Sequence, residues 1–126
     1  MLNMTIGDKD YDVNFGIAFV RELDKKHSEA YGENIKYGVG LMVMLSKLLI
    51  GDVTALEDII YAGTCTEGKR PSQKDMDEFI DTHEDIDALF EEVIEELKKS
   101  NACKKQATMV TAKVEEAQKA ESTTKS

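Results

Sequence analysis

Hydrophobic and polar residues alternate at the start of the chain, in the pattern of a β-hairpin. Apolar side chains occupy every second position of residues 2–6 and again of residues 11–13, and the turn-forming sequence GDKD lies between them at residues 7–10. Strands of such a pair bury one face and leave the other in water. We therefore expect a short N-terminal hairpin whose acidic residues face the solvent.

The acids of this region also have the alternation of a calcium-binding loop. Asp8, Asp10, Asp12 and Asn14 place oxygen atoms at every second position. An EF-hand loop also needs a glycine at its sixth position and a glutamate at its twelfth, and the sequence has neither in either register. The turn is therefore the better interpretation, with Asn14 as the N-cap of the helix that follows.

Beyond the hairpin, apolar residues recur at spacings of three and four, as on one face of an α-helix. The last two helical segments open with the capping patterns SQKD and THED. Five segments have these signals: residues 14–32, 34–52, 54–63, 72–81 and 82–99. Residues 63–71 hold two glycines and the only proline and are expected to form a surface loop. The predicted fold is mainly α (α+β), with a short N-terminal β-hairpin followed by four to five packed helices.

The most apolar segment of the chain is VGLMVMLSKLLI at residues 39–50. Its apolar residues cover almost the whole circumference of a helix, which is typical of a helix in the centre of a core or shared with another subunit. Flexible methionines suit either core filling or an adaptable binding surface. Partner binding or self-association through this helix is therefore a hypothesis, and its candidate residues are Met42, Met44, Leu45, Leu48 and Leu49.

Residues 100–126 differ from the rest in composition. They are rich in Ala, Lys, Thr and Ser, lack aromatic residues, and hold few large apolar side chains. Such a segment buries too little surface to offset the entropy lost on ordering. We therefore predict a globular hairpin-plus-helices domain at residues 1–99 and a polar, flexible C-terminal tail at residues 100–126. The tail has five lysines and three glutamates, and the whole chain carries −9, so residues 1–99 carry −11.

The negative charge narrows the classes of partner. Binding to a phosphate backbone or to an anionic membrane depends on Lys and Arg, so neither nucleic acid nor membrane is expected. The longest apolar run, residues 39–50, is too short to span a bilayer, and the N-terminus lacks the pattern of a signal peptide. Two widely separated cysteines do not form a disulfide framework. These features predict a cytoplasmic protein with a protein partner.

The sequence contains no catalytic or metal-binding motif. His27, His83, Cys65 and Cys103 have none of the spacings of a zinc site, and no strand-to-helix elbow surrounds either thiol. The acids near the last predicted helix fall opposite its apolar seam, as on a solvated face. That acidic group comprises Asp81, Glu84, Asp85, Asp87, Glu91, Glu92, Glu95 and Glu96. We expect no enzyme activity, cofactor or metal.

A family resemblance rests on three stretches: MTIGDKDYDVNFGIAFVRELDKKH at residues 4–27, RPSQKDMDEFIDTHEDIDALFEEVIEELKKSNA at residues 70–102, and the polar tail. Together they resemble the tail assembly chaperones of long-tailed bacteriophages, including prophages of Gram-positive bacteria. The resemblance covers about residues 1–102 and carries over no residue-specific role.

The resemblance implies a non-catalytic function in the host cytoplasm. Proteins of this family bind the tape measure protein, keep it soluble and assist polymerisation of the tail tube protein around it. Many are made as a short form and a frameshift-extended form. The alternative interpretation, based on the charge alone, is an acidic phage-borne inhibitor protein that mimics DNA.

Overall fold

The computed structural model of the chain describes residues 2–31 and 39–124. It begins with the expected hairpin, in which β1 (Leu2–Ile6) pairs antiparallel with β2 (Lys9–Val13). Gly7 and Asp8 form the turn, and Gly7 has a φ of 65°. A positive φ at the first of two turn residues alone is the pattern of a type II′ turn, which matches the twist of paired strands. The predicted hairpin is confirmed.

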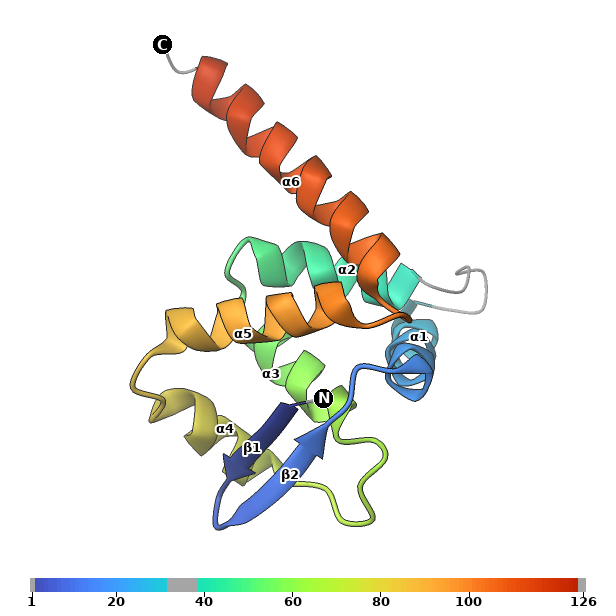
Figure 1. Cartoon of the computed structure of the whole chain (residues 1–126), viewed down its shortest axis with the longest axis vertical. Helices are drawn as coiled ribbons and strands as arrows, with labels where there is room; N and C mark the ends of the chain where they lie inside the picture. The colour runs from blue at the N-terminus through green and yellow to red at the C-terminus, as the bar shows by residue number, and fades with distance from the viewer. Residues whose placement is uncertain (1, 32–38, 125–126) are drawn as a thin grey trace.

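Six helices follow the hairpin in the described part of the chain. They are α1 (Ile17–Tyr31), α2 (Val39–Leu49), α3 (Val53–Gly63), α4 (Gln73–Asp81), α5 (Ile86–Lys99) and α6 (Lys104–Thr124). Helix α2 packs against α1, α3, α5 and α6, while the hairpin packs against α3 and α4 (Figure 1). The predicted mainly α fold with an N-terminal hairpin is confirmed, and α2 is its central helix.

The helical periodicity of the sequence identifies most of the core. In α1, Phe15 just before the helix, Phe19 and Leu23 are buried, and the rings of Phe15 and Phe19 meet edge to face at 4.8 Å. Ile17, although apolar and part of the same helix, is 59% exposed. The helix begins at Ile17 itself, so this residue lies at the rim of the apolar face and does not reach the core.

Side-chain caps determine where several helices start. Asp52 caps α3 and accepts from the backbone N–H groups of Thr54 and Ala55, and Ser72 caps α4 as predicted. The THED prediction is wrong by three residues. Thr82 is the C-cap of α4, and Asp85 is the N-cap of α5.

The predicted N-cap of α1 is also wrong. Gly16, and not Asn14, provides the carbonyl that accepts from the backbone N–H of Val20. The backbone N–H of Asn14 instead donates to the carbonyl of Gly63, at 2.8 Å. This bond fixes the end of the hairpin to the end of α3, which leaves the helix to start after residue 14. The predicted stop of α1 at Gly32 lies outside the described residues.

Two side chains connect the segment between α3 and α4 to the body: Glu67, whose carboxylate accepts from the backbone N–H of Asp12 at 2.6 Å, and Arg70. The Arg70 guanidinium donates to both carboxylate oxygens of Glu22 at 2.6 and 2.7 Å and to the carbonyl of Tyr61 at 2.6 Å. It also stacks over the Tyr61 ring, 4.0 Å from its centre, and donates to the Thr64 hydroxyl. Thr64 is fully buried. The segment is therefore a structural connection to α1 as well as a surface loop.

Residues 104–124 are helical, which the composition of the predicted tail did not indicate. Cys103, Ala107 and Val110 are buried against the core, so the first part of α6 is held by tertiary contacts. Its outer part projects beyond the other elements (Figure 1). Ser100 and Cys103, at the corner between α5 and α6, both donate to the carbonyl of Phe15, at 2.5 and 3.4 Å. The predicted division into a domain at 1–99 and a tail at 100–126 stays a prediction.

Candidate protein-binding surface

One apolar hollow on the surface lies between α2 and α6, and we call it the α2/α6 groove. It has a volume of about 200 Å³. Its lining residues are Met42, Ser46, Gln106, Met109, Val110, Lys113, Val114 and Ala117. Met42 is 42% exposed and Met109 is 47% exposed, one on each helix. The groove thus presents two flexible thioethers to the solvent, and Lys113 is the only charged residue among the described residues of its lining.

The second hollow lies between the end of α2 and α5, and we call it the α2/α5 groove. It has a volume of about 560 Å³ and continues to the start of α3. Its lining residues are Leu48, Leu49, Gly51, Val53, Ile86, Asp87, Phe90, Glu91 and Ile94. Val53 is 41% exposed, and Ile50, at the adjoining turn, is 69% exposed. In the described part of the chain, this groove combines an apolar floor with two carboxylates and no basic residue.

The five residues proposed from the sequence lie in different environments, from the buried core to the exposed surface. Leu45 and Leu48 are 2% and 1% exposed and belong to the core, although Leu48 also reaches the α2/α5 groove. Met44 and Leu49 are half-buried and pack against the core. Met42 is exposed in the α2/α6 groove. Within the described structure, α2 is therefore a core helix with one exposed methionine and one half-buried leucine at the grooves.

The part of the surface that α6 supplies was not predicted from the sequence. Residues of this helix make up most of the lining of the α2/α6 groove, and they belong to the segment that was predicted to be a polar, flexible tail. A signal was nevertheless present, because Cys103, Ala107, Val110 and Val114 follow the spacing of four, three and four that marks one helix face. Each of these residues is buried or packs against the core.

The groups considered for catalysis or metal binding lie in ordinary structural positions. Cys65 and Cys103 are free thiols, and burial raises the pKa of both, which disfavours the reactive thiolate. The His83 ring contacts the Phe79 ring at 5.5 Å, and the side chain of His27 lies outside the described ones. Across residues 2–31 and 39–124, no group of three or more His, Cys, Asp or Glu side chains is placed to hold a metal ion.

The acids near α5 are mostly exposed to solvent. Asp81, Glu84, Asp85, Asp87, Glu91, Glu92 and Glu95 are all exposed, and Glu96 is half-buried. Two of them, Asp87 and Glu91, also line the α2/α5 groove. The acidic group is therefore a solvated face with one edge along an apolar hollow. No described helix is both long enough and apolar enough to be a candidate for crossing a membrane.

Two carboxyl groups, Glu57 of α3 and Asp77 of α4, form a pair that shares one hydrogen-bond donor. The side-chain amide of Gln73 donates to Glu57 Oε1 at 2.7 Å and to Asp77 Oδ1 at 2.9 Å. Burial, followed by the hydrogen bond and charge of Asp77, raises the pKa of Glu57 to about 7. This pair lines neither groove. It affects how the free energy of unfolding depends on pH.

The small helical domain thus has two apolar surface grooves, and exposed apolar surface of this kind is typical of proteins that bind other proteins. The sequence profile of the phage tail assembly chaperone protein family, TAC, matches residues 3–111, which span the hairpin, α1 to α5 and the start of α6. The chain therefore belongs to the phage tail assembly chaperone family. No curated protein and no solved structure matches the sequence.

Proposed function

We propose that this chaperone binds the tape measure protein of its phage in the host cytoplasm and keeps it soluble while the tail tube protein polymerises around it. The proposed mechanism is non-catalytic. Preferential binding of exposed apolar segments suffices, because a ligand that binds one state of a client shifts the population of that state by mass action. No cofactor or energy source is needed for such holding.

The observation that carries this proposal is the α2/α6 groove. A holding chaperone needs apolar surface that a client can cover, and it needs net charge to keep the complex dispersed. Met42 and Met109 supply exposed, adaptable apolar surface on two packed helices. The chain supplies a net charge of −9. Both requirements are met in one small domain of a tail assembly chaperone family.

Co-expression with the tape measure protein tests this function. The full chain should raise the soluble fraction of the client, measured after cell lysis and centrifugation. The double variant Met42→Gln/Met109→Gln should lose most of this effect, because it makes the groove polar. Both side chains are exposed, so the fold should lose no more than about 0.5 kcal/mol per substitution.

Ile17→Gln is the matched control, because Ile17 is 59% exposed on α1 and lines neither groove. It should keep the client as soluble as the wild type does. A client whose solubility does not depend on the chain would contradict the proposal. Inhibition of a DNA-binding enzyme in the same cells would then favour the DNA-mimic alternative.

A further inference from the structure

The two grooves beside α2 differ in the charge of their rims. Among the described residues, Lys113 is the only charged residue that lines the α2/α6 groove, whereas the charged residues that line the α2/α5 groove are the acids Asp87 and Glu91. Apolar contacts supply affinity at such sites, and charges at the rim select among partners that have similar apolar faces. The α2/α5 groove is therefore suited to a partner whose apolar stripe is flanked by positive charge.

We propose that the α2/α5 groove binds an amphipathic helix of a partner protein whose apolar stripe is bordered by Lys or Arg. This inference rests on the proposed chaperone function and names the kind of client segment that this groove accepts. The expected mode is a helix lying in a groove between two helices, which uses apolar anchors at spacings of three and four.

The shape of the site supports a helical partner. The groove follows α5, whose 14 residues span about 21 Å. Its floor is formed by half-buried side chains that already pack against the core, chiefly Leu49, Phe90 and Ile94. Val53 and Ile50 extend this apolar surface at the turn between α2 and α3. An added strand would instead need a sheet edge, and neither described strand lines this groove.

The electrostatics support a basic partner. Asp87 and Glu91 are one helical turn apart on α5, so their carboxylates border the groove on the same side of that helix. The exposed acids Glu84, Asp85 and Glu92 lie on and beside the same helix and add to the negative field, while Glu95 is paired with Lys98 at 3.9 Å. A chain of net charge −9 attracts cations from a distance, which raises the rate of encounter with a basic segment.

Two designed peptides distinguish this proposal from simple hydrophobic adhesion. Both carry the same leucine stripe on a helix, one with flanking lysines and one with flanking glutamates. Binding to the full chain is measured by fluorescence anisotropy at low and at physiological salt. The lysine peptide should bind about tenfold more tightly than the glutamate peptide, and salt should reduce the difference. Equal binding of the two peptides would overturn the proposal.

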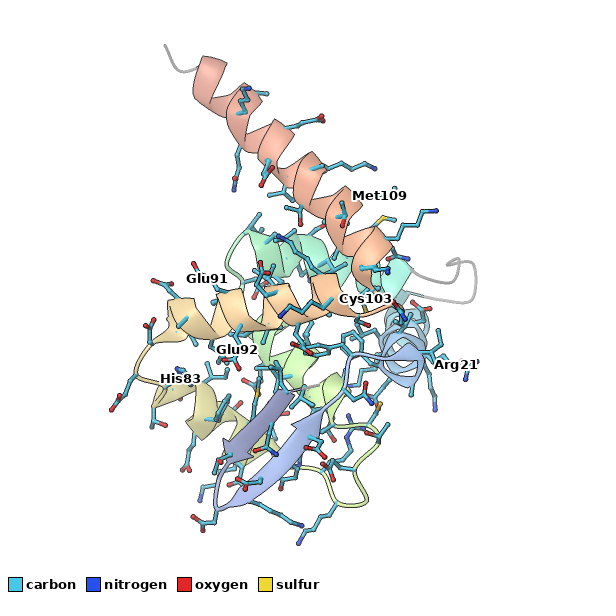
Figure 2. The ribbon with its side chains drawn as sticks, in the orientation of Figure 1. Arg21, His83, Glu91, Glu92, Cys103 and Met109 are labelled. Carbon is cyan, nitrogen blue, oxygen red and sulfur yellow. The ribbon has the colours of Figure 1, made fainter. Side chains whose placement is uncertain are left out.

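Adjacent residues of α5 provide a matched pair of variants. Glu91 lines the groove and Glu92 does not, and Figure 2 shows the two on different sides of the helix. Glu91→Lys should lower the affinity for the lysine peptide about tenfold. Glu92→Lys makes the same change in net charge and should lower this affinity less than about threefold. Equal effects of the two variants would mean that only total charge matters, which would contradict a specific groove.

The apolar floor is tested separately. Val53→Ser changes a 41% exposed groove residue, and Ile17→Ser changes a 59% exposed residue outside the groove. Only the first should reduce peptide binding. Sedimentation of the wild type is the final check. A stable dimer that Glu91→Lys dissociates would assign the groove to a second copy of the chain and would refute the proposed partner.

Failure of this proposal is distinguishable from failure of the chaperone function. If Glu91→Lys and Val53→Ser still keep the tape measure protein soluble while neither peptide binds the wild type, the function stands and the assignment of this groove is wrong. If the chain binds the lysine peptide but has no effect on the client, the groove specificity stands and the function is wrong.

Discussion

The backbones of α1 and α2 touch at Leu23 and Gly40. A Cβ atom on Gly40 would lie 2.6 Å from the carbonyl oxygen of Leu23 and 2.8 Å from its carbonyl carbon. Both atoms belong to the backbone, so no side chain can rotate away to make room. Glycine at this position therefore allows the central helix to approach α1 closely.

Gly40→Ala should destabilise the protein by about 2 kcal/mol, because α2 must move away from α1 to accommodate the methyl group. Urea unfolding measures this loss. Gly68→Ala is the control, since no atom lies within 4 Å of its Cβ position. In a helix free of contacts, alanine at residue 40 would instead gain about 1 kcal/mol. A stabilising Gly40→Ala would therefore contradict the close approach of the two helices.

Arg70→Lys should lower the free energy of unfolding by about 2 kcal/mol. Lysine cannot reproduce the two parallel bonds to Glu22 or the stacking on Tyr61. A double-mutant cycle with Glu22→Gln measures the interaction energy between Arg70 and Glu22, and we expect a coupling energy of about 1 kcal/mol. Additive effects of the two substitutions would show that the pair does not hold the segment between α3 and α4.

Glu57 should make stability depend on pH. Its pKa is about 7 in the folded protein, against an ordinary value of 4.5. Between these values the folded state binds more protons than the unfolded state, so the free energy of unfolding should fall as pH rises from about 4.5 to 7. Stability is highest below this window, where Glu57 is protonated in both states, and lower above it, where the partly buried carboxylate is charged in the folded state. Urea unfolding at a series of pH values follows the change.

Glu57→Gln should remove most of that slope. At pH 8 the variant should be more stable than the wild type by about 1 kcal/mol, the fraction of the full shift that remains after solvent screening. Glu78→Gln is the control, because Glu78 is exposed on α4 outside the pair. A wild-type stability that stays constant from pH 4.5 to 7 would refute the assignment to Glu57.

Helix α6 should have two parts of different stability. The amides near Ala107 and Val110 should exchange slowly with deuterium, because these side chains are buried, whereas residues 115–120 are exposed and should exchange quickly. Val110→Ala should cost about 2 kcal/mol and speed exchange in the first part. Glu115→Ala should change neither the free energy of unfolding nor the exchange rate of the first part. Rapid exchange along the whole helix would support the flexible tail that composition predicts.

Local patterns in the sequence were sufficient to predict the hairpin and the first five helices. Alternation placed Met4, Ile6, Tyr11 and Val13 on the buried face of the hairpin, where the structure has them. Periodicity identified the seam of α5, of which Leu89, Val93 and Leu97 are buried. Both predictions succeeded for the same reason. The side-chain periodicity of a strand or a helix determines which residues share its buried face.

Features that depend on distant contacts were not predictable in this way. The bond from Asn14 to Gly63 shifts the start of α1, and the contacts of Arg70 with Glu22 and Tyr61 hold a segment that by composition is a loop. The candidate site shows the same limit. Met42 was identified from its apolar helix, but Met109, which lines the same groove, lies in a polar segment that packs on α2 and α5.

The carbonyl of Phe15 has a consequence for the order in which the protein is made. Its two donors, Ser100 and Cys103, follow it by 85 and 88 residues. A ribosome adds about 5–20 residues per second, so on the order of ten seconds separate the synthesis of the acceptor from that of its donors. The junction between the hairpin and α1 is thus completed late, after nearly all of the helical core has emerged from the ribosome.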